Sequence, residues 1–250
     1  MPTNQTYHKN YLTDVICRID FPPILELLND TPKDFQKLLS EDFPILEPVR
    51  RLGVRIEGKD TNITTEKLDS TVWRFLNKDK NTQIELTSEF LAIVSKQYTD
   101  FSSFKSIVEK VFNSFYELFP ATIVNRLGLR YINQLHFDEE NVFEWDDYLV
   151  SELTSHLEFV SDKSMIRRSL QAMELAIDEE TRLTFRYGMF NSSYPSQIIN
   201  KEFVLDFDCF AISSLLKDDL LSNLSKFNQI TTDYFEKSIK NNLRSKLNAN

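Results

Sequence analysis

Alternation of hydrophobic and polar residues predicts several strands in the first part of the chain. Residues 15–21 alternate and end at Pro22 and Pro23, which cannot continue a ladder of hydrogen bonds. The stretch 24–39 has helical spacing in one or two short pieces. Further strand patterns follow over 46–57, 71–76, 83–86 and 90–96, with residues 59–70 as a polar connection. These patterns predict a strand, a helical segment and then an antiparallel meander.

The clearest helical pattern follows this meander. Its apolar residues recur at steps of three and four, and they are Phe101, Phe104, Val108, Val111, Phe115 and Leu118. Asp100 is a typical N-cap residue, and Pro120 cannot continue the helix. The stripe predicts a helix that packs one face against a sheet.

The order of elements repeats in the second part of the chain. A strand over 123–137 and an amphipathic helix over 145–160 precede strands at 165–177, 181–190 and 202–210, and a final helix includes 227–239. The halves 1–120 and 121–250 thus share the order strand, helix, antiparallel meander, helix. We expect a duplicated α+β fold, with helices packed on one face of a curved antiparallel sheet and both halves in one compact unit. The order is similar to that of the duplicated saddle of the TATA-box-binding protein, an analogy that carries no function.

A five-residue motif of arginine, leucine or valine, and glycine occurs once in each half. In a strand its two arginines and its glycine share one face, which leaves a notch between two cations. Such a notch suits an anion or a side chain of another protein. The alternative is a glycine that makes room for a bulky neighbour, with the arginines paired to carboxylates across the sheet. The residues are Arg51, Gly53 and Arg55 in the first copy and Arg126, Gly128 and Arg130 in the second.

Along the strands predicted in the second half, arginines and aspartates occupy every second or fourth position, with apolar residues between them. Their side chains therefore fall on one face of each strand. Three interpretations stay open. The first is a set of cross-strand ion pairs on a solvated sheet, and the second is an anion site for a nucleotide or a nucleic-acid backbone. The third is catalysis in which two aspartates share a divalent metal. The residues concerned are Arg126, Arg130, Arg182, Arg186, Asp206 and Asp208.

Composition narrows the classes of function. Only four of the 250 residues are glycine, which argues against the glycine-rich loops that hold nucleotides. The net charge of −9 is unlike the basic footprint of most nucleic-acid-binding domains. The histidines and cysteines have no metal-ligand or nucleophile spacing, so we expect no cofactor and no metal.

The remaining sequence signals concern location and partners. Cys17 and Cys209 lie far apart and are expected to be buried free thiols in a reducing compartment. Residues 1–12 are polar, and we find no stretch long enough to cross a membrane, so we predict a cytoplasmic protein. The segment 138–158 carries acidic residues and no lysine or arginine, typical of a solvated helix face or of a docking surface for a basic partner.

Two strand motifs carry a family resemblance. Residues 14–21 (Asp-Val-Ile-Cys-Arg-Ile-Asp-Phe) and 126–133 (Arg-Leu-Gly-Leu-Arg-Tyr-Ile-Asn) resemble a sporadically distributed family of uncharacterised prokaryotic proteins of about this length. Residues 73–75 and 205–208 fit the same pattern, so the resemblance spans most of the chain. It carries over no catalytic residue. The sporadic distribution implies mobile genes, such as those of defence or toxin–antitoxin systems.

These observations favour a non-enzymatic binding protein. We expect the polar face of its sheet to engage an anionic ligand or a protein partner, the partner being another protein or a second copy of the chain. The alternative is a nucleic-acid-binding protein or a metal-dependent phosphodiester-cleaving enzyme that uses the arginines together with Asp206 and Asp208.

Overall fold

The computed structural model describes residues 7–29, 31–59 and 62–249, and it places their side chains except at 29, 51–59 and 62–70. The described residues form one nine-stranded sheet, in which all neighbouring strands are antiparallel and the order is β2-β3-β4-β5-β1-β6-β9-β8-β7. The strands are β1 (Leu12–Asp20), β2 (Ile45–Lys59), β3 (Asn62–Leu76), β4 (Thr82–Leu86), β5 (Phe90–Ser95), β6 (Arg126–Phe137), β7 (Ser169–Ala176), β8 (Thr181–Met189) and β9 (Lys201–Ala211).

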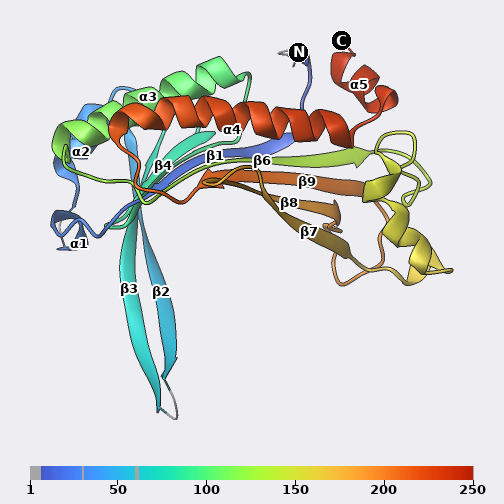
Figure 1. The fold of residues 1–250 in the computed structure, drawn as a ribbon, viewed down its shortest axis with the longest axis horizontal. Coiled ribbons are helices and arrows are strands. Elements are labelled where there is room, and N and C mark those ends of the chain that lie inside the picture. The colour runs from blue at the N-terminus through green and yellow to red at the C-terminus, as the bar shows by residue number, and fades with distance from the viewer. Residues whose placement is uncertain (1–6, 30, 60–61, 250) are drawn as a thin grey trace.

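The centre of the sheet joins the two parts of the chain. β1 pairs with β6 there, and these are the first strands of the two halves expected from the sequence. Outward from β1 lie β5, β4, β3 and β2, whereas β9, β8 and β7 lie outward from β6. β3 pairs with β4 only over residues 73–76, so most of the β2–β3 hairpin extends away from the sheet as a two-stranded ribbon (Figure 1).

Two long helices, α3 (Phe101–Leu118) and α4 (Lys217–Ser238), lie side by side over one face of the sheet (Figure 1). The shorter helices are α1 (Glu26–Asn29), α2 (Lys33–Leu39) and α5 (Asn241–Asn248). Three 3₁₀ helices, η1 (Ser151–Leu153), η2 (Ser155–Phe159) and η3 (Lys163–Met165), lie between β6 and β7. Helices and strands around a large antiparallel sheet confirm the α+β class.

The helix predicted after the meander is confirmed as α3. The carboxylate of Asp100 accepts a hydrogen bond from the backbone N–H of Ser103 at 2.9 Å, which caps the first turn. The helix ends two residues before Pro120. Its buried residues include Phe104, Val108, Val111 and Phe115, and they pack against the alternate, inward-facing residues of the strands. Cys17 and Cys209 belong to this core as free, buried thiols, also as predicted.

The polar connection predicted at 59–70 is wrong. Most of this stretch belongs to β3, which pairs continuously with β2 from Asn62 opposite Lys59 to Leu76 opposite Ile45. Backbone hydrogen bonds to β2 hold this polar sequence in an extended conformation. Because such bonds do not require apolar side chains, the hydrophobic pattern does not predict them.

The amphipathic helix predicted at 145–160 is also wrong, because turns and the short helices η1 and η2 occupy this stretch. The residues of its apolar stripe, Trp145, Leu149, Leu153 and Leu157, are buried as a helix pattern requires, whereas Phe159 is exposed. The backbone of the stretch bonds to the C-terminal end of α4. The N–H of Val150 donates to the carbonyl of Ser238, and the N–H of Lys240 donates to the carbonyl of Tyr148. At these two positions tertiary bonds replace the i to i−4 bonds that a continuous helix would make.

Candidate ligand cavity and the arginine-lined sheet face

The sheet face opposite the helices carries the arginines and aspartates predicted to share it. On β6, β8 and β9 the alternate residues Leu129, Leu183 and Phe207 are buried in the core, so the polar residues between them face the other way. Register places Arg130 opposite Asp208 on β9, and it places Asp208 opposite a threonine of β8. The structure therefore brings together Arg126, Arg130, Arg186, Asp206 and Asp208.

Arg130 closes onto Asp206. Its Nε lies 2.7 Å from Oδ1 and its Nη2 lies 2.6 Å from Oδ2, so the guanidinium binds the carboxylate in a bidentate fashion. A second arginine, Arg186, places Nη1 3.6 Å from the same carboxylate. The Asp206 side chain is only 7% exposed, so both cations contribute to holding a buried negative charge.

Arg126 fills the notch expected at Gly128. A Cβ atom at Gly128 would lie 2.8 Å from Nη1 of Arg126, because the guanidinium folds back over the glycine. There it lies 3.3 Å from Oδ1 of Asp208 and 3.6 Å from Oδ2 of Asp20, and it stacks on Phe210. Burial raises the pKa of Asp208 even so, since desolvation outweighs the attraction of the nearby arginines.

The other predicted site residues lie elsewhere. Arg182 donates hydrogen bonds to the backbone carbonyls of Asp178 and Thr181, at the turn between β7 and β8. Arg51, Gly53 and Arg55 belong to β2, and their side chains lie outside the described residues.

The arrangement on this face matches the ion-pair interpretation that the sequence left open, because each of the five gathered residues lies within 4 Å of a group of opposite charge. Within the described part of the chain, no group of three or more His, Cys, Asp or Glu side chains is arranged to hold a metal ion. The two aspartates instead contact arginines.

A cavity of about 540 Å³ lies on the other, helix-covered face. Six segments line it: the N-terminal stretch 7–12, residues 98–102 at the start of α3, the strands β6 and β9, the second half of α4, and α5. Its volume falls in the range of small-molecule sites, roughly 300–1,000 Å³. The lining residues are Tyr7, Lys9, Asn10, Tyr11, Leu12, Tyr98, Thr99, Asp100, Phe101, Ser102, Tyr131, Asn133, Phe207, Asn228, Thr231, Thr232, Phe235, Glu236 and Leu247.

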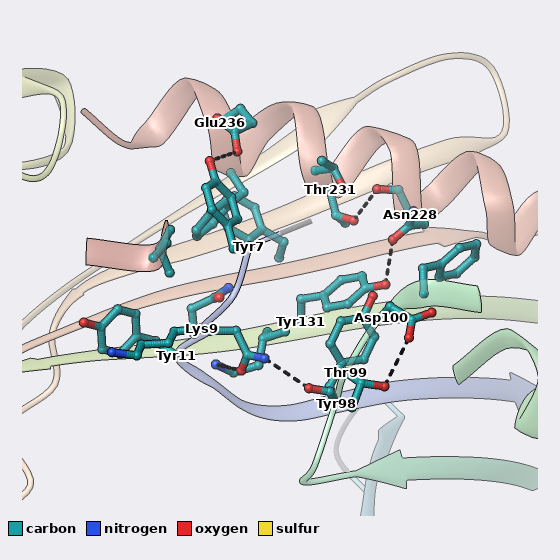
Figure 2. Close-up of a pocket in the computed structure, with 18 of the residues that line it drawn as sticks. Tyr7, Lys9, Tyr11, Tyr98, Thr99, Asp100, Tyr131, Asn228, Thr231 and Glu236 are labelled. Atoms are coloured by element: carbon teal, nitrogen blue, oxygen red, sulfur yellow. Dashed lines mark hydrogen bonds between the residues drawn. The ribbon is translucent and has the colours of Figure 1, made fainter. Parts of the chain in front are cut away.

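Tyrosine and amide side chains form the inner wall. The Tyr131 hydroxyl donates to Oδ1 of Asn228 at 2.7 Å, and the ring of Tyr98 meets the ring of Tyr131 edge to face at 5.6 Å (Figure 2). Burial raises the pKa of Tyr98 to about 12 and that of Tyr131 well above its ordinary value. Both phenols are therefore neutral hydrogen-bonding groups at physiological pH.

The N-terminal stretch closes one side of the cavity. The Tyr7 hydroxyl donates to Glu236 on α4, as Figure 2 shows, and Glu236 also accepts from Arg244 at 2.9 Å. The Lys9 backbone N–H donates to the carbonyl of Leu247. Nδ2 of Asn10 donates to the Tyr98 carbonyl at 3.0 Å. These bonds tie the stretch to α4, α5 and the loop before α3.

Sequence reasoning missed this cavity. Tyr131 and Asn133 belong to the motif at 126–133, but the other lining residues come from segments without a common spacing. Two tyrosines near the N-terminus, Tyr7 and Tyr11, are a weak local signal, and nothing in the sequence pattern joins them to a distant helix.

Comparison with known proteins adds no assignment, since no protein-family model and no curated protein matches the chain. The helices of the described residues include none that is long and apolar enough to cross a membrane.

Proposed function

We propose that this protein is a binding protein whose ligand site is the cavity between α4, the start of α3 and the N-terminal stretch. The observation that carries the proposal is the kind of side chain that lines the cavity. A cavity of about 540 Å³ combines aromatic rings with amide and hydroxyl groups, which is the composition typical of small-molecule sites.

The arginine-lined face is a weaker candidate for a ligand site than the cavity. Arg130 and Arg126 already bind Asp206 and Asp208, so an anion would have to displace carboxylates of the protein. This face lies opposite the helical layer, and binding there of a protein partner or a second copy of the chain stays a prediction from the sequence. So do the cytoplasmic location and the link to mobile defence systems.

Uptake of the neutral dye Nile red tests the proposal, because its fluorescence rises when it enters an apolar, water-excluding site. The variant Ser102→Trp places an indole at the rim of the cavity, where Ser102 is exposed. Ser106→Trp is the matched control, since Ser106 is exposed one turn further along α3 and does not line the cavity.

We expect one saturable Nile red site in the wild type and in Ser106→Trp, and at least a tenfold weaker site in Ser102→Trp. Circular dichroism and thermal unfolding check that both variants fold. Equal uptake by the two variants, or no saturable uptake by the wild type, would refute the proposal.

We also propose that the two halves arose by duplication. In support, each half places its first strand at the centre of the sheet and its last strand directly outside it, as β1–β5 and β6–β9. In each half a long helix on the same face, α3 or α4, follows the last strand, and in the second half the short helix α5 comes after α4 (Figure 1). Separate chains 1–120 and 121–250, expressed together, test whether each half is a folding unit. We expect the two chains to associate through β1 and β6, and failure to form a folded complex would contradict this.

A further inference from the structure

The charged groups that line the cavity are already engaged within the protein. The Asp100 carboxylate accepts hydrogen bonds from the Ser103 backbone N–H and hydroxyl, and Glu236 is held by Tyr7 and Arg244. Lys9 also takes part in an interaction within the chain. A charged ligand would have to compete with these existing partners for Asp100 and Glu236, and an ion that found no partner would lose its hydration at a cost of several kcal/mol. The cavity therefore favours an uncharged ligand.

The aromatic rings favour a flat ligand. Tyr7 and Phe207 each meet Phe235 edge to face at 6.4 Å, on the α4 side of the cavity. Tyr98 and Tyr131 form a second edge-to-face pair on the sheet side. Aromatic residues on two sides of the cavity give it apolar walls, and where a base stacks on an aromatic side chain the contact contributes about 1–3 kcal/mol.

Asn228 supplies a directional polar contact. Its Oδ1 accepts from Tyr131, which fixes the orientation of the amide, while its Nδ2 donates to no group among the hydrogen bonds of the described residues. Tyr98 and Thr232, which carry hydroxyl groups, also line the cavity. A fixed amide beside hydroxyl groups is suited to the polar edge of a nucleobase, where donors and acceptors alternate.

We propose that the cavity binds an uncharged planar heterocycle, a nucleobase or a nucleoside without phosphate, with Asn228 at its polar edge. This inference rests on the proposed binding function and names the class of ligand. A free hexose fits this argument less well than a base, because it has no flat aromatic surface to pack against the rings.

Competition with Nile red tests the ligand class on the intact protein. Adenosine, guanosine, cytidine and uridine are titrated against the dye, together with their 5′-monophosphates and with glucose. We expect at least one nucleoside to displace the dye, its monophosphate to bind at least tenfold more weakly, and glucose to have no effect.

The variant Asn228→Asp keeps the acceptor for Tyr131 and replaces the amide donor with a carboxylate. We expect it to weaken nucleoside binding, measured directly by titration calorimetry, at least tenfold. Equal nucleoside affinity of Asn228→Asp and the wild type would overturn the placement of Asn228 at the polar edge of the ligand. Asn242→Asp, at an exposed position of α5 outside the cavity, is the matched control and should bind the nucleoside as the wild type does.

The outcomes separate the two proposals. If Nile red binds at the cavity but no nucleoside displaces it, the ligand class is wrong and the binding function stands. Tighter binding of a monophosphate, or displacement by glucose alone, also overturns the ligand class. If the wild type takes up no Nile red, both proposals fail.

Discussion

The ion pair between Arg130 and Asp206 offers a direct test of whether the arginine-lined face stabilises the fold. Arg130→Met removes the guanidinium but keeps much of its aliphatic stem. The buried Asp206 carboxylate then loses two hydrogen bonds, of 2.7 and 2.6 Å. It keeps Arg186, whose Nη1 is 3.6 Å away.

The expected loss in the free energy of unfolding follows from the burial of the Asp206 side chain. Removing one partner of a buried ion pair costs about 3–5 kcal/mol, whereas an exposed pair contributes about 0–1 kcal/mol. Asp206 is 7% exposed but Arg130 is 36% exposed, and Arg186 remains as a partial replacement. We therefore expect Arg130→Met to lower the free energy of unfolding by about 2–3 kcal/mol. For a chain of this size the melting temperature would fall by roughly 5–10 °C.

Urea unfolding followed by circular dichroism measures this change. The matched control is Arg18→Met on the same face of the sheet. Arg18 pairs with Asp20, but its side chain is 41% exposed, so the expected loss is at most about 1 kcal/mol. If Arg130→Met is as stable as the wild type or more stable, Arg130 does not stabilise the fold. The anion-site interpretation of this face would then be preferred.

Two further predictions concern a glycine and a buried ion pair. Gly188 has a φ of +136°, and a Cβ there would lie 2.0 Å from a backbone carbonyl oxygen, so Gly188→Ala should cost roughly 2–4 kcal/mol in urea unfolding. Gly128→Ala, which meets only a flexible side chain, should cost about 1 kcal/mol or less, and equal losses would contradict this reasoning. Lys201, 3% exposed, donates to Glu139 at 2.7 Å, and this bond is the main cause that lowers the pKa of Glu139 to about 2. Because the folded pKa lies below its ordinary value, Glu139 stabilises the fold above about pH 4.5, and this contribution is lost as the pH falls towards 2. Glu139→Gln should therefore lower stability by about 2 kcal/mol at pH 7 and flatten its pH dependence between pH 5 and 2, whereas an unchanged acid limb would contradict the assignment.

Much of the fold follows from local sequence. The alternation at 15–21 and the stripe from Phe104 to Phe115 determine which side of each element is buried, because side chains repeat every two residues in a strand and about every 3.6 in a helix. The cap at Asp100 and the two buried cysteines follow from the same local signals. The shared face of Arg130 and Asp206 was predictable for this reason as well.

Tertiary structure decided which residues meet. Alternation places Arg130 and Asp206 on one face, but only the register of β6 against β9 brings them into contact, with Arg130 opposite Asp208. The segment 145–160 has a helical pattern, yet its backbone bonds to the end of α4 and leaves the helix unformed.

The cavity also depends on tertiary structure alone. Tyr7, Tyr98, Tyr131 and Asn228 come from four segments far apart in the sequence, and they converge because α3 and α4 cross a sheet whose central strands are β1 and β6. Sequence periodicity records which face of an element is apolar. It does not record which other element covers that face, and that choice created the proposed ligand site.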